Sequence, residues 1–312
     1  MLRSIPYLDA EMVERSTPMP ALIAALRKAF AEGRHVAPAR LATDMSARAS
    51  LLVMPAWRAN TSLGVKVVEV DRDASPAIRA TYILIDRTTG TPRALFDGAA
   101  LTRRRTAAAS VLAAGYLARP HSKRLLLLGT GALNAPLIEA YASAFPIEAI
   151  QIWGRDPAKA EAVAGAARAL GYPAVATADI ATALQRADIV SAATLATTPL
   201  IAGEALVPGT HVDLIGAFRP EMCEADGIAF ARSRVFVDTL HGALEEAGDL
   251  LQAIAAGHFT AGAIEGDLAA LCTGANPGRD GDDTAITLFK SVGTAIEDLA
   301  AAELALAGQA LP

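Results

Sequence analysis

The 312-residue sequence contains only two cysteines, Cys223 and Cys272. Two cysteines exclude a disulfide framework and any Cys-x-x-Cys metal site, and they are typical of proteins in a reducing cytosol. The histidines His211, His241 and His258 lack the spacing of metal ligands, so we expect no metal site. The pattern Gly-x-Ser-x-Gly is also absent, which leaves a serine hydrolase without support.

The sequence has no excess of positive charge and no long apolar run. Its net charge is −5 and its isoelectric point is near 5.6, so nothing indicates a nucleic acid or an anionic membrane as a partner. The uncharged run at residues 106–118 is too short to span a bilayer, and the first residues have no secretory hydrophobic region. We therefore expect a soluble cytoplasmic protein, and 312 residues are enough for two domains with substantial cores.

One motif stands out in residues 125–134, which read Leu-Leu-Leu-Leu-Gly-Thr-Gly-Ala-Leu-Asn. The four leucines predict a short buried strand. Gly129 and Gly131 then permit a tight turn in which backbone N–H groups approach an anion, as in a dinucleotide-binding loop. Because Asn134 stands where the motif has its third small residue, these ten residues alone fit an ordinary strand-to-helix turn equally well.

Predicted strands and helices alternate after this turn. We expect strands at 149–153, 174–176, 188–194, 211–216 and 234–238, and helices at 158–170 and 180–186. This alternation predicts an α/β fold with a Rossmann-type, doubly wound parallel sheet, in which the glycine turn binds the dinucleotide.

The end of the second predicted strand indicates which dinucleotide binds. NAD-specific domains usually place a carboxylate there for the ribose 2′-hydroxyl, whereas this strand ends in Trp153-Gly154-Arg155. A glycine beside an arginine leaves room and charge for a 2′-phosphate. Asp156 precedes Pro157 and has the pattern of a helix N-cap. We therefore expect NADPH as the cofactor, with NADH as the alternative. The plainer interpretation of Arg155 is that it is only a solvated charge in a loop.

Residues 1–118 precede the nucleotide domain and predict an α+β unit with a largely antiparallel sheet. We expect a helix at 20–32 ending at Gly33, and strands at 50–55, 63–70, 81–86 and 92–96. The apolar segment 285–306 is expected to be mostly helical and could return to pack on this first domain. Its preceding loop, 273–283, has the pattern of a solvated linker rather than a calcium site.

Three basic residues of the first domain are candidates for anion binding. Lys66 lies inside the apolar run Gly-Val-Lys-Val-Val, although a strand lysine often points to solvent by simple alternation. Arg105 is expected just before a small-residue helix, where its charge opposes the helix dipole and calls for an anionic partner. Arg40 follows Pro38 in an otherwise ordinary loop, and its position alone does not indicate a function.

Seven short motifs occur in order along nearly all 312 residues. They are Gly64-Val-Lys66, Leu101-Thr-x-x-Arg105-Thr-Ala-Ala-Ala-Ser, Gly129-Thr-Gly-Ala, Ala187-Asp-Ile-Val, Pro208-Gly-Thr-His, Glu246-Ala-Gly-Asp-Leu and Phe289-Lys-Ser-Val-Gly293. Together they resemble the ornithine cyclodeaminase/mu-crystallin family of NAD(P)-dependent proteins. The resemblance implies a homodimer. It also implies a substrate and dimerisation domain (1–118 plus 290–312) into which a nucleotide domain (119–289) is inserted.

The segment Ile215-Gly-Ala-Phe218-Arg-Pro220 indicates which branch of the family this sequence resembles. Cyclodeaminases have a catalytic Asp where this sequence has Phe218. The sequence is instead similar to the branch that reduces the cyclic ketimines Δ1-pyrroline-2-carboxylate and Δ1-piperideine-2-carboxylate to L-proline and L-pipecolate. An alanine-dehydrogenase-like enzyme, an ornithine cyclodeaminase and a non-enzymatic NADPH-regulated binding protein remain alternatives.

The resemblance also implies roles for individual residues. Arg40 would clamp the carboxylate of the small cyclic imino acid, and Lys66 would be the catalytic group that donates a proton or hydrogen bond at the imine. Phe218 would form an apolar wall and Glu246 would balance the iminium charge, with Thr81 completing the substrate site. The residues expected to bind the cofactor are Arg105, Thr106, Gly129, Thr130, Gly131, Ala132, Leu133, Gly154, Arg155, Asp156, Thr194, Leu195, Ile215 and Val292.

Overall fold

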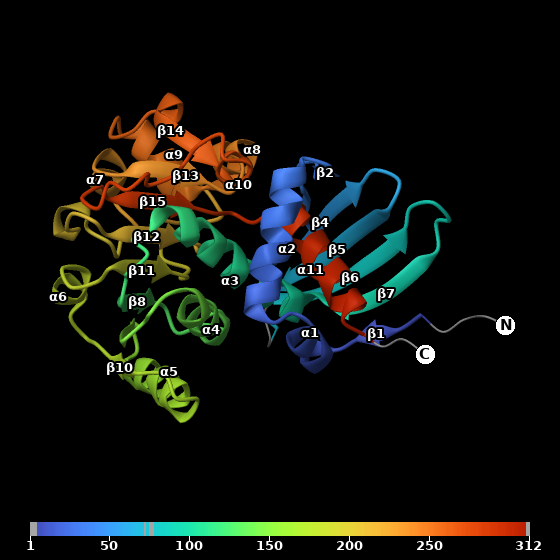
Figure 1. The fold of residues 1–312 in the computed structure, drawn as a ribbon, viewed down its shortest axis with the longest axis horizontal. Coiled ribbons are helices and arrows are strands. Elements are labelled where there is room, and N and C mark those ends of the chain that lie inside the picture. The colour runs from blue at the N-terminus through green and yellow to red at the C-terminus, as the bar shows by residue number, and fades with distance from the viewer. Residues whose placement is uncertain (1–4, 72, 75–77, 310–312) are drawn as a thin grey trace. The chain divides into compact units, whose positions relative to one another are not determined.

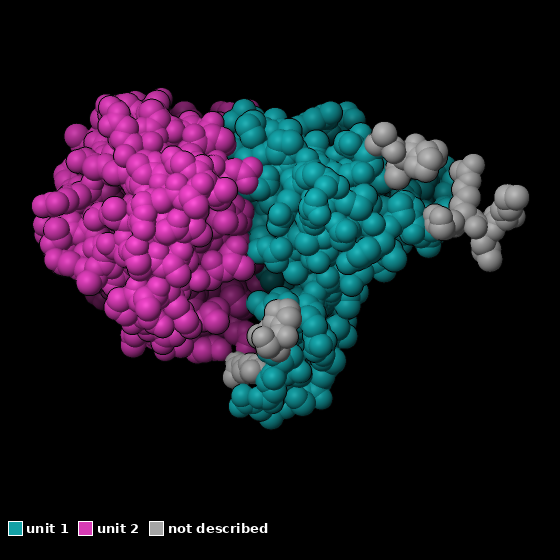
Figure 2. Space-filling view, turned by 90° about the horizontal axis from the view of Figure 1, so that it is seen from below, with its two compact units in different colours: residues 1–109, 293–312 teal, residues 110–292 magenta. Residues whose placement is uncertain are grey.

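The structure of the protein is a computed structural model that describes residues 5–71, 73–74 and 78–309. The chain forms two compact units (Figure 2), unit 1 from residues 1–109 and 293–312 and unit 2 from residues 110–292. The family resemblance implied boundaries near 118 and 290. The observed division instead falls inside one continuous helix, α3 (Gly98–Leu117), and directly before Gly293.

Unit 1 contains a mainly antiparallel sheet. Within the described residues its strand order is β1-β7-β6-β5-β4-β2, with β3 also paired to β4 and only β1 running parallel to its neighbour. β6 and β7 form an antiparallel pair joined by a short turn at residues 86–91. The strands are β1 (Tyr7–Leu8), β2 (His35–Val36), β3 (Leu41–Asp44), β4 (Ala49–Arg58), β5 (Ser62–Asp71), β6 (Ile78–Asp86) and β7 (Pro92–Asp97).

In the described part of unit 1, three helices accompany the first part of α3. They are α1 (Ala10–Ser16), α2 (Met19–Glu32) and α11 (Ala295–Ala307). The predicted helix at 20–32 is confirmed, and it ends at Gly33 in the left-handed conformation. α11 contacts β4, β5 and β6, and α2 lies beside it (Figure 1). One face of the sheet is thus covered by the last helix of the chain.

Unit 2 is described throughout and contains eight strands, all paired in parallel. Their order is β10-β9-β8-β11-β12-β15-β13-β14. The strands are β8 (Arg124–Leu128), β9 (Ala149–Trp153), β10 (Ala174–Ala176), β11 (Ile189–Ala192), β12 (His211–Leu214), β13 (Arg234–Val237), β14 (Ile264–Asp267) and β15 (Thr287–Lys290). The predicted α/β fold with a doubly wound parallel sheet is confirmed.

Helices and single 3-10 turns connect these strands. They are α4 (Asn134–Ala144), α5 (Pro157–Ala169), α6 (Ile180–Leu184), η1 (Gly203–Ala205), α7 (Gly227–Ala231), α8 (Leu240–Glu246), α9 (Gly248–Ala255), η2 (Ala261–Ala263) and α10 (Leu268–Thr273). Local signals start several of them. Asp156 caps α5 by accepting from the N–H groups of Ala158 and Lys159, and Pro157 is its first residue, so the predicted N-cap is confirmed.

The apolar segment 285–306 is helical over its second part, as predicted, but its first part contains a strand. Residues Thr287–Lys290 form β15, and the helix α11 begins only at Ala295. β15 pairs with β12 on one side and with β13 on the other, and its four residues are fully buried. An apolar run of this length fits a buried strand as well as a buried helix, and the ladder bonds on both sides decide for the strand.

The strand order of unit 2 reverses direction between β8 and β11. The chain moves from β8 outward through β9 to β10, and then returns to β11 on the other side of β8. In open parallel sheets the crevice at such a reversal, beyond the carboxyl ends of the strands, is where ligands bind. None of the helices in the described part of the chain is long and apolar enough to cross a membrane.

A carboxylate is buried among hydroxyl groups at the centre of unit 2. Asp213 on β12 is fully buried and accepts hydrogen bonds from Ser110 (3.1 Å), Tyr141 (3.0 Å) and Ser191 (2.7 Å). Burial raises the pKa of Asp213 to about 6, and the three hydroxyl donors oppose that rise. These bonds join α3, α4 and β11 to β12.

We expect Tyr141→Phe to reduce the free energy of unfolding by about 1–3 kcal/mol, because a buried carboxylate loses one donor. Urea unfolding followed by circular dichroism measures this. Tyr172→Phe is the matched control, since Tyr172 is only half-buried, and it should change stability by less than about 0.5 kcal/mol. Equal midpoints for the two variants would contradict the prediction.

Candidate functional site

Unit 2 has a cavity of about 530 Å³ at the carboxyl end of its sheet. Three segments line it, and each follows the end of a strand, namely β8, β9 and β11. This volume is in the range of ligand pockets, and the position is the one expected from the reversal of strand order. The lining residues are Gly129, Thr130, Gly131, Trp153, Gly154, Arg155, Asp156, Lys159, Ala193, Thr194, Leu195, Ala196, Thr197, Thr198 and Leu200.

The turn after β8 brings the backbone unusually close to the next strand. Gly129 has a φ of 118°, and its N–H donates to the carbonyl of Trp153 at 2.9 Å. A Cβ atom at this position would lie 2.7 Å from the carbonyl oxygen of Ala193. Only glycine fits here, because any side chain would strain the backbone and push the segments after β8 and β11 apart. The predicted glycine turn is therefore present, and it lies at the cavity.

The segment after β9 carries positive charge at the edge of the same cavity. Arg155 is exposed and lines the cavity, and Gly154 is buried against Thr130. Lys159, in the first turn of α5, also lines the cavity and supplies a second cation. The sequence interpretation missed Lys159. Its position three residues after the N-cap Asp156 is the signal that could have placed it beside the loop.

The predicted cofactor residues fall into three groups. Those that line the cavity are Gly129, Thr130, Gly131, Gly154, Arg155, Asp156, Thr194 and Leu195. Those in unit 2 that do not line it are Ala132, Leu133, Ile215 and Val292. Ala132 instead lines a smaller cavity of about 190 Å³, Leu133 precedes α4, and Ile215 and Val292 are buried. Arg105 and Thr106 belong to unit 1.

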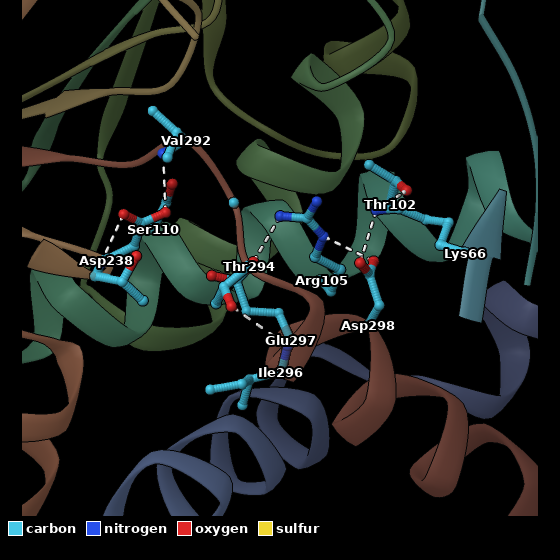
Figure 3. A network of polar contacts seen from close by, with 12 residues as sticks. Lys66, Thr102, Arg105, Ser110, Asp238, Val292, Thr294, Ile296, Glu297 and Asp298 are labelled. Atoms are coloured by element: carbon cyan, nitrogen blue, oxygen red, sulfur yellow. Dashed lines mark hydrogen bonds and ion pairs between the residues drawn. The ribbon is translucent and has the colours of Figure 1, made fainter. Parts of the chain in front are cut away.

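A buried cluster of charges lies in unit 1 (Figure 3). Lys66 on β5 is 2% exposed, and its Nζ lies 2.7 Å from Oδ2 of Asp298 and 3.2 Å from Oγ1 of Thr102. Lys66 therefore does not point to solvent. Burial lowers its pKa to about 8, and the Asp298 carboxylate opposes that fall. A lysine with such a pKa can hold or donate a proton near neutral pH.

Arg105 completes the cluster. Its Nη1 lies 2.6 Å from Glu297 and its Nε lies 3.1 Å from Asp298, and these carboxylates raise its pKa (Figure 3). The expected anionic partner of Arg105 is thus present. The expected place before a helix is wrong, because α3 already begins at Gly98 and Arg105 lies within it. Glu297 and Asp298 were missed; two acids at the start of an apolar helix are the signal.

Arg40 lies near this cluster. Its side chain is half-buried, and Nη2 donates to the carbonyl of Gly293 at 3.0 Å. The charge of Arg40 helps to lower the pKa of Lys66, as does that of Arg105. Unit 1 therefore gathers three cations and two carboxylates in one place, and Arg40 is the most accessible of the cations.

The remaining predicted substrate residues, Thr81, Phe218 and Glu246, lie outside this cluster. Thr81 on β6 is exposed; its neighbour Tyr82 is the cross-strand partner of Lys66, so Thr81 lies on the opposite face of the sheet. Phe218 is half-buried against the apolar core of unit 2, and Glu246 is the last residue of α8, also in unit 2. Because residues adjacent in a strand point to opposite faces, Thr81 and Lys66 cannot share a pocket on this face.

Asp298→Asn should lower the free energy of unfolding by about 3–5 kcal/mol, because Lys66 and Arg105 would both lose a charged partner inside the protein. Denaturant titration at pH 7 measures the loss. Glu11→Gln removes an exposed carboxylate of the same unit that pairs with Arg15, and it should cost less than about 1 kcal/mol. A variant as stable as this control would show that the buried cluster contributes little.

The sequence of this chain is similar to that of known proteins along most of its length. The model of the ornithine cyclodeaminase/mu-crystallin family matches residues 7–306. A Δ1-pyrroline-2-carboxylate reductase of Paracoccus denitrificans is 38% identical to this chain, over 80% of each protein.

Two solved structures have the same fold over nearly the whole chain. One is the Δ1-pyrroline-2-carboxylate reductase of Thermococcus litoralis in complex with NADH and L-proline. It has a TM-score of 0.92 and 30% identity, covering 97% of both chains. The other is an archaeal alanine dehydrogenase dimer with bound NAD, which has a TM-score of 0.90 and 27% identity, covering 97% of this chain and 95% of that one.

Proposed function

Because the chain belongs to the ornithine cyclodeaminase/mu-crystallin family, we propose that it is an NAD(P)H-dependent oxidoreductase that reduces a cyclic ketimine. The substrates proposed are Δ1-pyrroline-2-carboxylate and Δ1-piperideine-2-carboxylate, and the products are L-proline and L-pipecolate. The reductases named among its relatives support an imine-reducing enzyme. The observation that carries the proposal is the charge cluster of unit 1, in which Arg40 is the accessible cation for an anionic substrate and Lys66, paired with Asp298, can donate a proton to its imine.

The cavity of unit 2 is the proposed cofactor site. The Gly129 turn suits the pyrophosphate, since no side chain stands between its backbone and the cavity. When bound, the reduced nicotinamide supplies the hydride. Solved relatives bind NADH or NAD. We propose a preference for NADPH here, because Arg155 and Lys159 can both pair with a 2′-phosphate and no carboxylate follows β9 directly.

Arg40 and Lys66 are the proposed substrate residues. Arg40 can bind the ring carboxylate through two parallel N–H bonds, which also fixes the orientation of the neighbouring C=N carbon. Lys66 can keep the imine nitrogen protonated, since its pKa is lowered to about 8 and Asp298 holds its ammonium group in place. Protonation of the imine nitrogen makes the neighbouring carbon a better acceptor of hydride.

Phe218 favours reduction over cyclodeamination. Cyclodeaminases of this family place a carboxylate at this position, and an apolar ring supplies neither a base nor a partner for a second amine. We propose that Phe218 contacts the ring methylenes of the substrate and excludes water. Its half-buried position on the core of unit 2 leaves part of the ring accessible.

A single assay with purified protein separates the candidate functions. NADPH is mixed with Δ1-pyrroline-2-carboxylate, and separately with pyruvate plus ammonia, and the absorbance of the reduced nicotinamide is followed. We expect oxidation with the cyclic imine. Oxidation only with pyruvate plus ammonia would instead indicate an alanine dehydrogenase, which the archaeal structure makes the second candidate. No oxidation in either mixture would indicate a binding protein.

Arg40→Met should raise KM for the cyclic imine about ten- to a hundredfold and change kcat less, because a charged hydrogen-bond pair to the carboxylate is lost. Steady-state kinetics at saturating NADPH measure both constants. Arg48→Met is the control, since Arg48 is an exposed arginine of the same unit that pairs with Asp73. An unchanged KM in the Arg40 variant would remove Arg40 from the substrate site.

Replacing both cations beside the cavity tests the cofactor preference. We expect Arg155→Ser with Lys159→Ala to weaken NADPH binding about ten- to a hundredfold while leaving NADH binding nearly unchanged, since NADH has no 2′-phosphate. Titrations followed by the fluorescence of Trp153, which lines the cavity, report both affinities. A parallel loss for NADH would mean that the two residues act on another part of the cofactor.

The homodimer is also a proposal. The archaeal relative is described as a dimer, and unit 1 exposes apolar side chains on its strands that a second copy could cover. Examples are Leu41, Val67 and Ile78, which are 61%, 36% and 50% exposed. Light scattering coupled to size-exclusion chromatography determines the mass in solution.

A further inference from the structure

A second buried charge cluster lies in unit 2, and the proposed chemistry does not use it. Glu224, Asp249 and Lys290 are each no more than 1% exposed. Asp249 and Lys290 belong to two of the motifs that the sequence shares with its family, Glu246-Ala-Gly-Asp-Leu and Phe289-Lys-Ser-Val-Gly293. Buried charges are costly unless they are paired and hydrogen-bonded, so their position demands a physical reason.

The Glu224 side chain joins two segments that follow neighbouring strands. Its Oε1 accepts from the N–H of Thr194 at 2.6 Å and from the Thr194 hydroxyl at 2.8 Å. Its Oε2 accepts from the N–H of Gly216 at 2.6 Å. Thr194 follows β11 and lines the cofactor cavity, whereas Gly216 follows β12. A Cβ atom on Gly216 would meet the Thr194 carbonyl at 2.0 Å, so the two segments are in tight contact.

The Glu224 backbone holds the far end of the same cavity-lining segment. Its carbonyl accepts from the N–H groups of Leu200 and Ile201 at 2.8 and 2.9 Å, and the preceding N–H, that of Cys223, donates to Ala196 at 2.8 Å. The segment from Thr194 to Leu200, which forms one wall of the cavity, is therefore bound to Glu224 at both of its ends.

Glu224 is itself held in place by Asp249, which forms an ion pair with Lys290. Oδ1 of Asp249 on α9 accepts from the backbone N–H groups of Glu224 and Ala225, the latter at 3.0 Å. Oδ2 of Asp249 lies 2.9 Å from Nζ of Lys290 on β15. This arrangement gives Asp249 a cation and backbone donors, which together offset its burial.

We propose that Glu224 is a positioning residue of the dinucleotide site, which holds the cavity wall formed by the Thr194 segment, and that Asp249 and Lys290 hold Glu224. This proposal rests on the proposed function only in taking the cavity of unit 2 as the cofactor site. Because all three bonds end on its two carboxylate oxygens, Glu224 acts on the cofactor through Thr194 and Gly216 and does not have to touch it.

The proposal has a consequence for pH. Burial raises the pKa of Glu224 to about 7; the Asp249 charge adds to that rise and Lys290 opposes it. Cys223, the residue before Glu224, stays a neutral thiol because burial raises its pKa to about 12. The ionised carboxylate accepts all three bonds, whereas a protonated one loses an acceptor. The wall should therefore loosen as pH falls through about 7, and cofactor affinity should fall with it.

The test is the affinity for NADPH and for NADH of the full-length Glu224→Gln variant, measured by Trp153 fluorescence between pH 6 and pH 9. The amide retains the size of the side chain but presents a donor where a backbone N–H needs an acceptor. We expect binding of both cofactors to weaken roughly tenfold or more at pH 8. The ratio of wild-type to variant affinity should shrink as pH falls below about 7, since only the wild type has a carboxylate to lose.

Glu204→Gln is the matched control, because Glu204 is an exposed glutamate of the same unit. It should leave both affinities and their pH profiles unchanged. If Glu224→Gln does not fold, Glu224→Asp keeps the charge but shortens the side chain, and it should still weaken binding of both cofactors.

Either Glu224 variant, folded by circular dichroism and binding both cofactors as tightly as wild type, would overturn the proposal. So would weakened binding with an unchanged wild-type-to-variant ratio across the pH range, which indicates a merely structural role. The experiment measures cofactor binding alone. Failure of the imine assay with intact NADPH binding would therefore overturn the proposed reaction without bearing on Glu224.

Discussion

Charged side chains that leave water must find partners inside the protein, and both units of this molecule depend on that requirement. In unit 1, Lys66 and Arg105 lie in the core because Glu297 and Asp298 reach them from the last helix. The C-terminal segment is thereby bound to a sheet formed more than two hundred residues earlier, with unit 2 inserted between. In unit 2, Asp249 pairs with Lys290 and accepts hydrogen bonds from the backbone at Glu224 and Ala225, and Glu224 in turn binds the loops around the cavity.

The cavity itself follows from the order of the strands. Parallel strands end at one edge of a sheet, and the reversal between β8 and β11 opens that edge. The glycine turn after β8 and the segments after β9 and β11 then line the cavity. Gly129 lets the turn after β8 lie close to the segment after β11, and Glu224 accepts hydrogen bonds from that segment. A few buried polar contacts thus shape a site whose walls are irregular backbone.

Much of the fold could be predicted from short-range signals in the sequence. Alternation of apolar runs with helical patterns predicted the doubly wound sheet, and the Asp156-Pro157 pair predicted the start of α5, because capping and hydrophobic periodicity depend on residues a few positions apart. The run at 287–290 was misassigned for the same reason. Its length and composition suit helix or strand, and only its two neighbouring strands select one.

The glycine turn, the lack of a carboxylate directly after β9 and Phe218 could all be identified before the fold was known, since each is a matter of residue type at a position in a motif. Tertiary structure alone decided which charges meet. Nothing local distinguishes Lys66 from a solvated strand lysine, or Glu224 from an exposed loop glutamate. Their partners, Asp298 on α11 and Asp249 on α9, are distant in sequence. The energy of a buried ion pair depends on distances that exist only after the chain has folded.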